Sequence, residues 1–211
     1  KMYIEVSCLI YKTLIHLFIA LLITTIILME FNNETLRSAT KLWLEDEKKA
    51  LEKYGHISDW NTSNVTDMSY MFFCAKDFNQ PLNNWLTCNV TNMKNMFYGA
   101  QSFNQPINNW DTSNVTDMSY MFNNAQSFNQ PLYNWLTSNV TDMNHMFYDA
   151  FTFNQPLNNW STNKVTNMCF MFCDAHAFNQ PLYWNMSNVT DMNCMFCNAH
   201  AFNQPLYWIT S

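Results

Sequence analysis

Cysteine and histidine side chains lie close together in the last part of the sequence, and these residue types could bind a metal. They are Cys169, Cys173, His176, Cys194, Cys197 and His200. The Cys-x-x-Cys spacing of Cys194 and Cys197 is typical of structural zinc sites, whose ligands are thiolates and imidazoles. Duplication of one sequence unit explains the same pattern without a metal. The zinc hypothesis therefore rests on Cys173, Cys194, Cys197, His176 and His200, and the sequence otherwise predicts no metal and no cofactor.

A disulfide between Cys173 and Cys197 is a second chemical hypothesis. The seven cysteines are an odd number and do not recur once per repeat, so they are not the framework of the fold. A disulfide requires Cα atoms within about 7 Å, whereas neighbouring packed helices usually lie about 8 to 10 Å apart. The bond is therefore allowed only if this side of the molecule is tightly wound.

Catalytic motifs and a nucleic-acid-binding surface are both lacking. No glycine-rich phosphate loop, nucleophile elbow or Ser/His/Asp set occurs outside a repeated consensus. The formal net charge is −6, and residues 60–211 contain three lysines and no arginine against eight acidic residues. A basic surface for phosphates is therefore missing. We expect neither an enzyme nor a nucleic-acid-binding protein.

The elements that must position these residues come from an internal repeat. A unit of about 25 residues, W-D-T-S-N-V-T-D-M-S-Y-M-F-N-N-A-Q-S-F-N-Q-P-L-Y-N around Trp110, occurs six times in tandem. The tryptophans that open the units are Trp60, Trp85, Trp110, Trp135, Trp160 and Trp184. Such periodicity is typical of proteins in which each unit buries its apolar side only by stacking on its neighbours.

One half of each unit carries the apolar spacing of a short helix. Val65, Met68, Phe72 and Ala75 stand at i, i+3, i+7 and i+10, and their equivalents recur in every unit. The threonines equivalent to Thr66 are predicted to be N-caps of this helix. The acidic residues that often follow them are predicted to place negative charge on its first turn.

The other half of each unit is predicted to be extended. Pro81 prevents a helix from continuing into Leu82 and Trp85. The predicted fold class is therefore an α/β repeat solenoid, with coils of one short strand plus one short helix. Asparagines equivalent to Asn64 and Asn79 recur at two positions, and we predict that they form ladders that satisfy backbone groups at turns.

The repeated word W-x-x-S-N-V-T-D-M-x-x-M-F-x-x-A-x-x-F-N-Q-P-L resembles the repeat of the BspA-like leucine-rich repeat surface proteins. The resemblance covers about residues 60–211. It implies leucine-rich-repeat-like coils and a protein displayed on cell surfaces for adhesion or protein contact. The chain differs from that family in lacking a lipoprotein signal and a wall-sorting tail.

An apolar run occupies the N-terminal part of the chain. Residues 13–29, TLIHLFIALLITTIILM, are at the lower limit of a bilayer span. Lys1 and Lys12 precede the run, which predicts a signal anchor with the repeats on the non-cytoplasmic side. The alternatives are a cleaved signal peptide and a leader that does not belong to the mature chain.

A strongly charged segment separates the apolar run from the repeats. Between a helix start at Asn33 and a stop at Gly55, apolar residues stand at helical spacing, and Asp46 is placed to cap a second helix. We predict an N-terminal helical cap that covers the first coil. The predicted domains are an apolar segment, 1–30, a helical cap, 31–59, and the tandem repeats, 60–211, open at the C-terminus.

Positions that vary between units are the best candidates for a binding face, because constant positions mark the core that every coil shares. The variable aromatic positions are Tyr70, Phe73, Tyr98, Tyr120, His145, Tyr148 and Phe170. We predict that these rings are exposed and suited to contact with a protein or a glycan. The alternative is that they only pack against neighbouring coils.

The sequence therefore predicts a non-catalytic repeat protein for surface display, adhesion or protein–protein interaction, anchored in a membrane through residues 13–29. The alternative is a cytoplasmic protein-interaction scaffold whose apolar leader is not part of the mature chain. The protein or glycan ligand is not identified by any motif. An uncovered last coil also predicts end-to-end self-association.

Overall fold

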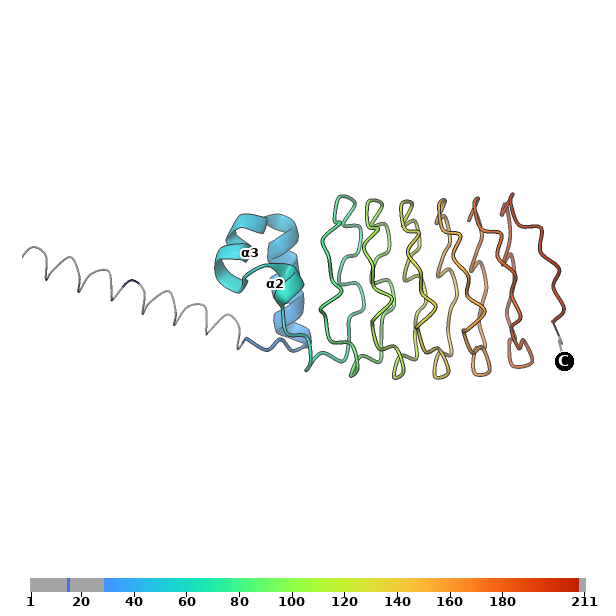
Figure 1. Ribbon diagram of the computed structural model, residues 1–211, viewed down its shortest axis with the longest axis horizontal. Coiled ribbons are helices and arrows are strands. Elements are labelled where there is room, and N and C mark those ends of the chain that lie inside the picture. Colours follow the sequence, from blue (N-terminus) through green and yellow to red (C-terminus); the bar gives the residue numbers. More distant parts are fainter. Residues whose placement is uncertain (1–14, 16–28, 209–211) are drawn as a thin grey trace, which may run out of the picture.

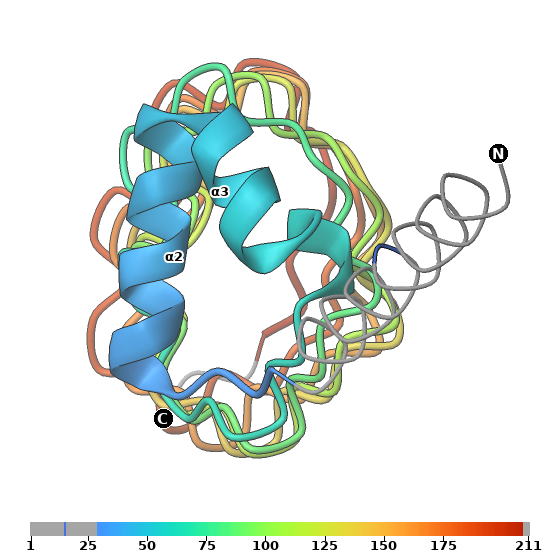
Figure 2. The ribbon, with the colours of Figure 1, turned by 90° about the vertical axis from the view of Figure 1, so that its left-hand side faces the viewer.

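The computed structural model of the chain describes residue 15 and residues 29–208. Two short helices stand beside a stack of coils, which residues 60–208 form along one axis (Figure 1). Viewed along this axis, the coils superimpose on nearly the same outline, and the helices lie across its near end (Figure 2). The repeats therefore stack in register behind the helices.

Helix α2 spans Asn33–Glu45, helix α3 spans Glu47–Tyr54, and a short 3-10 helix, η1, spans Ile57–Asp59. The buried side of α2 packs on the first coil, where Trp43 meets Trp60 edge-on with ring centroids 5.9 Å apart. The helices predicted for this segment are confirmed. They cover the apolar side chains at this end of the stack.

Local sequence explains where these helices begin and end. The Asn32 side chain accepts a hydrogen bond from the Thr35 N–H at 2.9 Å, and the Thr35 hydroxyl accepts one from the Asn32 N–H at 2.9 Å. The Asp46 carboxylate accepts the Lys49 N–H at 3.0 Å and so starts α3, as predicted. Gly55 ends α3 with a φ of 74°, a left-handed value that glycine adopts without steric cost.

The coils differ from the prediction. Within residues 60–208 the structure has neither an α-helix nor an extended strand. Isolated parallel bridges join neighbouring coils at one position per coil: Asp67, Asn92, Asp117, Asp142, Asn167 and Asp191. The predicted α/β solenoid of leucine-rich-repeat-like coils, each with one strand and one helix, is therefore wrong.

A series of turns replaces the predicted helix in each coil. In the first coil, the N–H groups of Met68, Tyr70, Phe72 and Cys74 donate to carbonyls of the next coil at 2.9, 2.9, 2.9 and 2.7 Å. Of the N–H groups between them, those of Met71 and Phe73 bond three residues back, to the Met68 and Tyr70 carbonyls at 3.3 and 3.2 Å. Tyr70 and Cys74 have φ values of 59° and 57°, which an α-helix excludes. An α-helix would use these N–H groups internally and leave the coils unlinked.

The threonine and acidic columns support this winding in another way than as helix caps. The Thr91 N–H donates to the Thr66 carbonyl at 2.8 Å, and the Thr91 hydroxyl donates to the same carbonyl at 3.2 Å. The Asp67 carboxylate accepts the Ser69 N–H at 2.8 Å, which closes an Asx turn. The predicted N-caps are therefore wrong, because there is no helix to cap.

The core consists of columns of equivalent side chains. Phe72, Phe97 and Phe122 are fully buried and stack nearly parallel, with centroids 5.3 and 5.6 Å apart. The Trp110 indole N–H donates to the Leu82 carbonyl, 28 residues earlier in the chain, at 3.0 Å, and Trp135 and Trp160 repeat this bond. Each coil thus depends on an in-register neighbour both for apolar burial and for the hydrogen bond of its tryptophan.

The predicted asparagine ladders are confirmed. The Asn104 N–H donates to the Asn79 side-chain oxygen at 2.9 Å, and the Asn129 N–H donates to that of Asn104 at 3.0 Å. In the second ladder, the Asn114 side-chain amide donates to the Cys88 carbonyl at 2.7 Å. These side chains satisfy backbone groups at turns that the backbone–backbone bonds between coils do not reach.

The structure does not support the membrane anchor predicted for residues 13–29. Of that segment only residues 15 and 29 are described, so nearly all of the prediction lies outside the described residues. Among residues 15 and 29–208, no helix has both the length and the apolar character needed to cross a bilayer. The structure therefore supports neither the predicted transmembrane segment nor the non-cytoplasmic location derived from it.

Candidate functional site

All the aromatic residues predicted to bind a ligand lie on the wall of turns, in two columns that run along the stack. The first column contains Tyr70, Tyr120, His145 and Phe170, with Asn95 and Cys194 at the remaining coils. The second column contains Phe73, Tyr98 and Tyr148, with Asn123, Cys173 and Cys197 at the remaining coils. We call these two columns the aromatic ridge.

The backbone holds the first column in the left-handed region. The φ values of Tyr70, Tyr120, His145 and Phe170 are 59°, 59°, 53° and 56°. Bulky residues adopt such values only at a cost of about 1 to 2 kcal/mol each. Inter-coil bonds fix this conformation, as where the Tyr120 N–H donates to the Asn144 carbonyl at 2.9 Å. The ridge is therefore a rigid product of the winding.

The ridge rings stack on one another from coil to coil. Tyr120 and His145 have centroids 4.4 Å apart at 12°, and His145 and Phe170 have centroids 4.8 Å apart at 21°. Phe73 and Tyr98 stack at 4.8 Å and 19°. In both columns an asparagine, at positions 95 and 123, interrupts the series of rings. Within the stacked series of Tyr120, His145 and Phe170, neighbouring ring faces cover one another, so these rings present mainly their edges and polar tips.

Partial burial shifts the ionisation of the ridge. Burial lowers the pKa of His145, although the nearby Asp142 carboxylate opposes this shift. Burial also raises the pKa of the Tyr120 hydroxyl. The pKa of Tyr148 is raised by burial and by the Asp174 carboxylate. These three side chains are therefore neutral at pH 7, and the centre of the ridge carries no charge of its own.

Carboxylates lie beside the ridge in the fourth and fifth coils. Burial and the neighbouring Asp174 raise the pKa of Asp149. The hydrogen bond from the Asn198 side-chain amide, 2.9 Å long, lowers the pKa of Asp174. The two residues occupy one column of successive coils. They give this part of the wall a negative charge.

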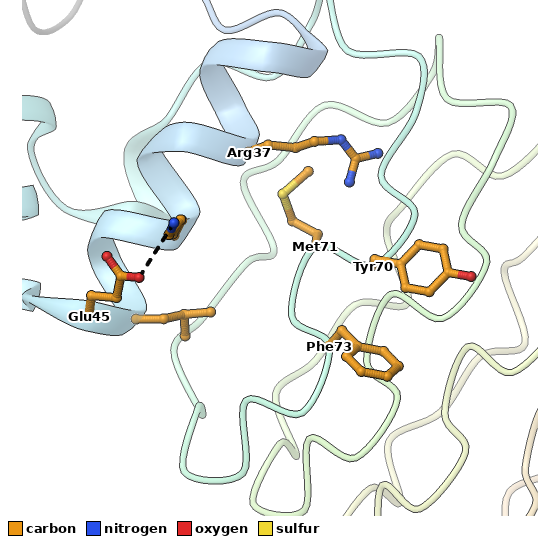
Figure 3. A pocket seen from close by; sticks show the side chains of 7 residues that line it. Arg37, Glu45, Tyr70, Met71 and Phe73 are labelled. Carbon is orange, nitrogen blue, oxygen red and sulfur yellow. Dashed lines mark ion pairs between the residues drawn. The ribbon is translucent and has the colours of Figure 1, made fainter.

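A pocket lies where α2 meets the start of the ridge (Figure 3). Its volume is ≈ 310 Å³, and its lining residues are Arg37, Lys41, Leu44, Glu45, Tyr70, Met71 and Phe73. Leu44, Tyr70 and Phe73 are 42%, 50% and 45% exposed, so three large apolar side chains share one hollow. The pocket extends the ridge onto the helical segment.

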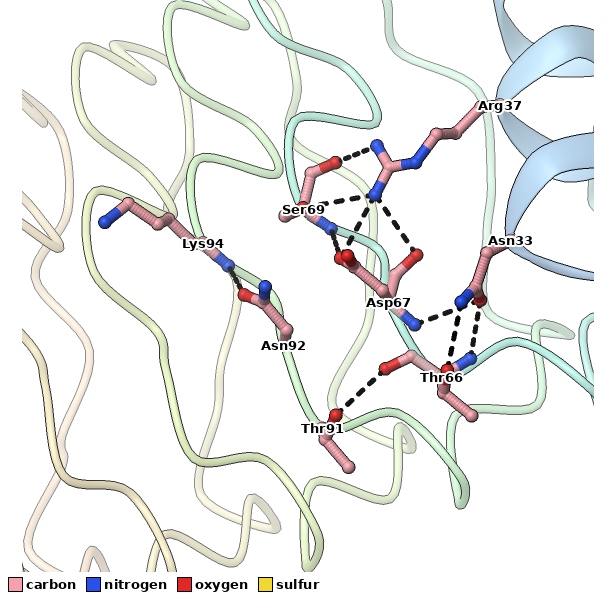
Figure 4. Close-up of polar contacts among 8 residues, drawn as sticks. All are labelled: Asn33, Arg37, Thr66, Asp67, Ser69, Thr91, Asn92 and Lys94. Atoms are coloured by element: carbon pink, nitrogen blue, oxygen red, sulfur yellow. Dashed lines mark hydrogen bonds and ion pairs between the residues drawn. The ribbon is translucent and has the colours of Figure 1, made fainter.

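Polar contacts fix α2 against the first coil (Figure 4). The Arg37 guanidinium lies 3.1 Å from the Asp67 carboxylate and donates to the Ser69 carbonyl and hydroxyl. The Asn33 side-chain oxygen accepts the Thr66 N–H at 2.9 Å. The contribution of α2 to the pocket is not among the predictions from sequence. The feature of the sequence that points to it is that Arg37 is the sole arginine of the chain.

The structure does not bring the predicted zinc ligands together. Cys173 and Cys197 belong to the second column of the ridge and Cys194 to the first. His176 and His200 stack on each other at 5.2 Å in a separate column. In the described part of the chain, no three Cys, His, Asp or Glu side chains are arranged to hold a metal ion. Unit duplication accounts for the pattern.

Comparison with protein families identifies the repeats. The family described as "Mycoplasma protein of unknown function, DUF285" matches residues 44–150 and 131–211, which together include most of the chain. The chain belongs to the DUF285 family. Neither the curated proteins nor the solved structures that were compared with it gave a match.

DUF285 is the family of the BspA-like repeat proteins, so the resemblance noted in the sequence is confirmed at the level of the family. The leucine-rich-repeat detail of that resemblance is not, because the coils of this DUF285 chain lack the strand and the helix that it implies. The family description names no activity. The function of this DUF285 chain must therefore be argued from its ridge.

Proposed function

We propose that this DUF285 chain is a non-catalytic interaction module whose aromatic ridge binds a protein, as adhesion proteins and scaffolds do. The observation that carries the proposal is the segregation of constant and variable positions. Constant positions such as Phe122 are fully buried in columns, whereas variable aromatic positions such as Tyr120 gather on one wall. A surface that changes from coil to coil on a constant frame can be matched to a specific partner.

Ring stacking favours a protein ligand over a glycan. Aromatic residues bind sugars mainly through an open ring face, whereas the faces of Tyr120, His145 and Phe170 lie against one another. At these three residues, ring edges and the Tyr hydroxyl remain for contact. These groups suit edge-to-face packing and hydrogen bonding with the side chains and backbone of a protein.

Charge along the wall indicates how a protein partner would be oriented. Arg37 and Lys41 pair with Asp67 and Glu45, whereas Lys94 extends from the second coil and Asp149 and Asp174 lie in the fourth and fifth. A partner with an acidic residue near Lys94 of the second coil and basic residues near the fifth coil would be complementary to both parts of the wall. This orientation is part of the proposal.

We do not propose catalysis, and the pKa values of the ridge side chains support a non-catalytic role. General acid–base catalysis at neutral pH favours groups with pKa values near 7. On the ridge, the pKa of His145 is lowered from its ordinary value and those of Tyr120 and Tyr148 are raised from theirs. These shifts move the pKa values of the three groups further from pH 7.

A peptide selection tests the proposal while the natural partner is still unidentified. The probe is a random peptide library displayed on phage, selected against the immobilised chain, and the enriched peptides are then measured individually by fluorescence anisotropy. We expect Tyr120→Ala and Phe170→Ala each to weaken their Kd about tenfold or more, because buried aromatic side chains dominate interface energies. Folding of each variant is checked by circular dichroism.

Tyr183→Ala and Tyr207→Ala are the matched controls. These tyrosines are 70% and 79% exposed and lie away from the ridge, so their loss is expected to leave the Kd unchanged. Peptides that depend on Tyr183 or Tyr207 and not on Tyr120 would refute the proposed surface. Tight, ridge-dependent binding on a glycan array, with no enriched peptide, would refute the protein ligand.

A further inference from the structure

Cys173 and Cys197 stand at the same position of the fifth and sixth coils, in the second column of the aromatic ridge. Because turns replace the predicted helices on this wall, the separation of packed helices does not apply to them. The Asp174 N–H donates to the Cys197 carbonyl at 2.8 Å. Backbones joined in this way are spaced by about 4.8 Å. That spacing lies inside the Cα range of disulfides, about 4.4 to 6.8 Å.

Two other pairs on this wall show how closely equivalent residues approach. Phe73 and Tyr98, in the same column as the two cysteines, have ring centroids 4.8 Å apart. In the adjacent column, a Cβ atom built on Gly99 lies 3.4 Å from the Cα and 3.5 Å from the Sγ of Cys74. Side chains at one position of successive coils therefore meet directly.

We propose that Cys173 and Cys197 form a reversible disulfide that joins the fifth and sixth coils, with a low-molecular-weight disulfide as the oxidant. Cys197 is exposed, so its thiolate attacks one sulfur of the oxidant, breaks that S–S bond and releases one thiolate. Cys173 then loses its proton to solvent and attacks the Cys197 sulfur, which releases the second thiolate. Two protein thiols are oxidised, and the oxidant is reduced to two thiols.

The surroundings of the two thiols set the order of the steps. Cys173 is buried, with 3% of its surface exposed, and its Sγ donates to the Asp174 carboxylate at 3.3 Å. Burial, followed by this hydrogen bond, raises the pKa of Cys173 to about 12. Cys173 is therefore a thiol at neutral pH and cannot react first. Ring closure is the slow step, and its rate rises about tenfold per pH unit below that pKa, with the thiolate fraction.

This bond is a covalent modification that is independent of the ligand proposed above. It would hold the sixth coil in register and fix the second column of the ridge at that end. Failure of one proposal leaves the other unaffected, because the test of the disulfide uses no peptide or partner.

The test uses the full chain, first reduced and then exposed to oxidised glutathione at pH 7, 8 and 9. Samples are quenched with acid and mapped by mass spectrometry of proteolytic fragments. We expect a glutathione adduct on Cys197 first, followed by its conversion to the Cys173–Cys197 disulfide about tenfold faster per pH unit. Dithiothreitol is expected to reverse the product. Cys74, which faces Gly99, is expected to keep its glutathione adduct.

Substitutions at the adjacent column sharpen the test. Asp174→Asn removes the carboxylate that raises the pKa of Cys173, so it is expected to accelerate closure. Asp149→Asn makes the same change one coil earlier and is expected to leave the rate unaltered. Both variants are compatible with the fold, because Asn124 and Asn198 occupy this column with φ values of 55°.

Several outcomes would overturn the proposal. A glutathione adduct on Cys197 that persists at pH 9 would exclude closure, and a link between Cys169 and Cys194 or between two chains would show a different pairing. Cys173→Ser must abolish closure and leave the adduct on Cys197, and Cys197→Ser must abolish both products. Closure in either serine variant would also refute it.

Discussion

The core columns and the aromatic ridge lie a few atoms apart in every coil, yet they tolerate change very differently. The Phe72 column is phenylalanine in all six coils and is stacked throughout. The Tyr70 column changes from Tyr to Asn, His, Phe and Cys while the backbone keeps φ between 53° and 59°. The difference teaches that the winding depends on the core and on inter-coil hydrogen bonds. The ridge is therefore free to carry specificity.

Removal of a core ring should have the largest effect on this contrast. Phe122→Ala opens a cavity between two stacked phenylalanines, and we expect a loss of about 3 to 5 kcal/mol in the free energy of unfolding. Urea denaturation followed by tryptophan fluorescence measures this loss. Fluorescence is informative because the Trp135 ring lies against Phe122, with centroids 6.1 Å apart.

Tyr120→Ala is the matched change, two residues earlier in the same coil. It removes a half-buried ring and its stack on His145, and we expect a loss of about 1 kcal/mol. Equal losses for Phe122→Ala and Tyr120→Ala would break the comparison. They would mean that the ridge rings hold the coils together as much as the core does.

Loss of an asparagine from the ladder should have an effect similar in size to Tyr120→Ala. Asn129→Ala removes the oxygen that accepts the Asn154 N–H at 2.9 Å, and we expect a loss of about 1 kcal/mol because the site is partly exposed. Amide hydrogen exchange of Asn154 should accelerate. Asn129→Asp keeps an acceptor oxygen and is the control that should preserve protection. Unchanged exchange in Asn129→Ala would show that the ladder does not support the turns.

Much of this architecture could be predicted from the sequence because it depends on periodicity. The recurrence of Trp110 and its equivalents fixes the unit length, and the constant apolar positions mark the core. The asparagine ladder also follows, because a residue repeated at one position must stack on itself. The helix at Asp46 follows from its capping residue, whose effect is local.

The conformation of the coil could not be predicted from the same pattern. Val65, Met68, Phe72 and Ala75 match helical spacing, but turns with left-handed residues at Tyr70 bury the same positions. The choice depends on inter-coil hydrogen bonds, which stabilise a backbone whose alternate N–H groups point along the stack. The spacing of apolar residues within one unit contains no information about bonds between units. The separation of Cys173 and Cys197 depends on the same choice, since packed helices would hold them about 8 to 10 Å apart.

The smallest expected effect is the pH dependence of the free energy of unfolding that arises from His145 on the ridge. Burial lowers the pKa of His145 from its ordinary 6.5, against the opposing effect of Asp142. In a window just below pH 6.5 the unfolded chain therefore binds more protons than the folded chain, and stability rises with pH there. Acidification through pH 6.5 should destabilise the fold, and the loss should stop growing below the folded pKa.

His145→Asn isolates this contribution. Asn95 stands at the same position of another coil with a φ of 55°, so asparagine fits the backbone. Urea denaturation of both proteins at pH 5.0 and 7.5 should show a smaller loss of stability on acidification for the variant. NMR titration of the His145 imidazole should give a pKa below 6.5. A pKa at or above 6.5 would mean that burial of the ring does not outweigh the Asp142 carboxylate, and it would contradict the predicted loss of stability on acidification.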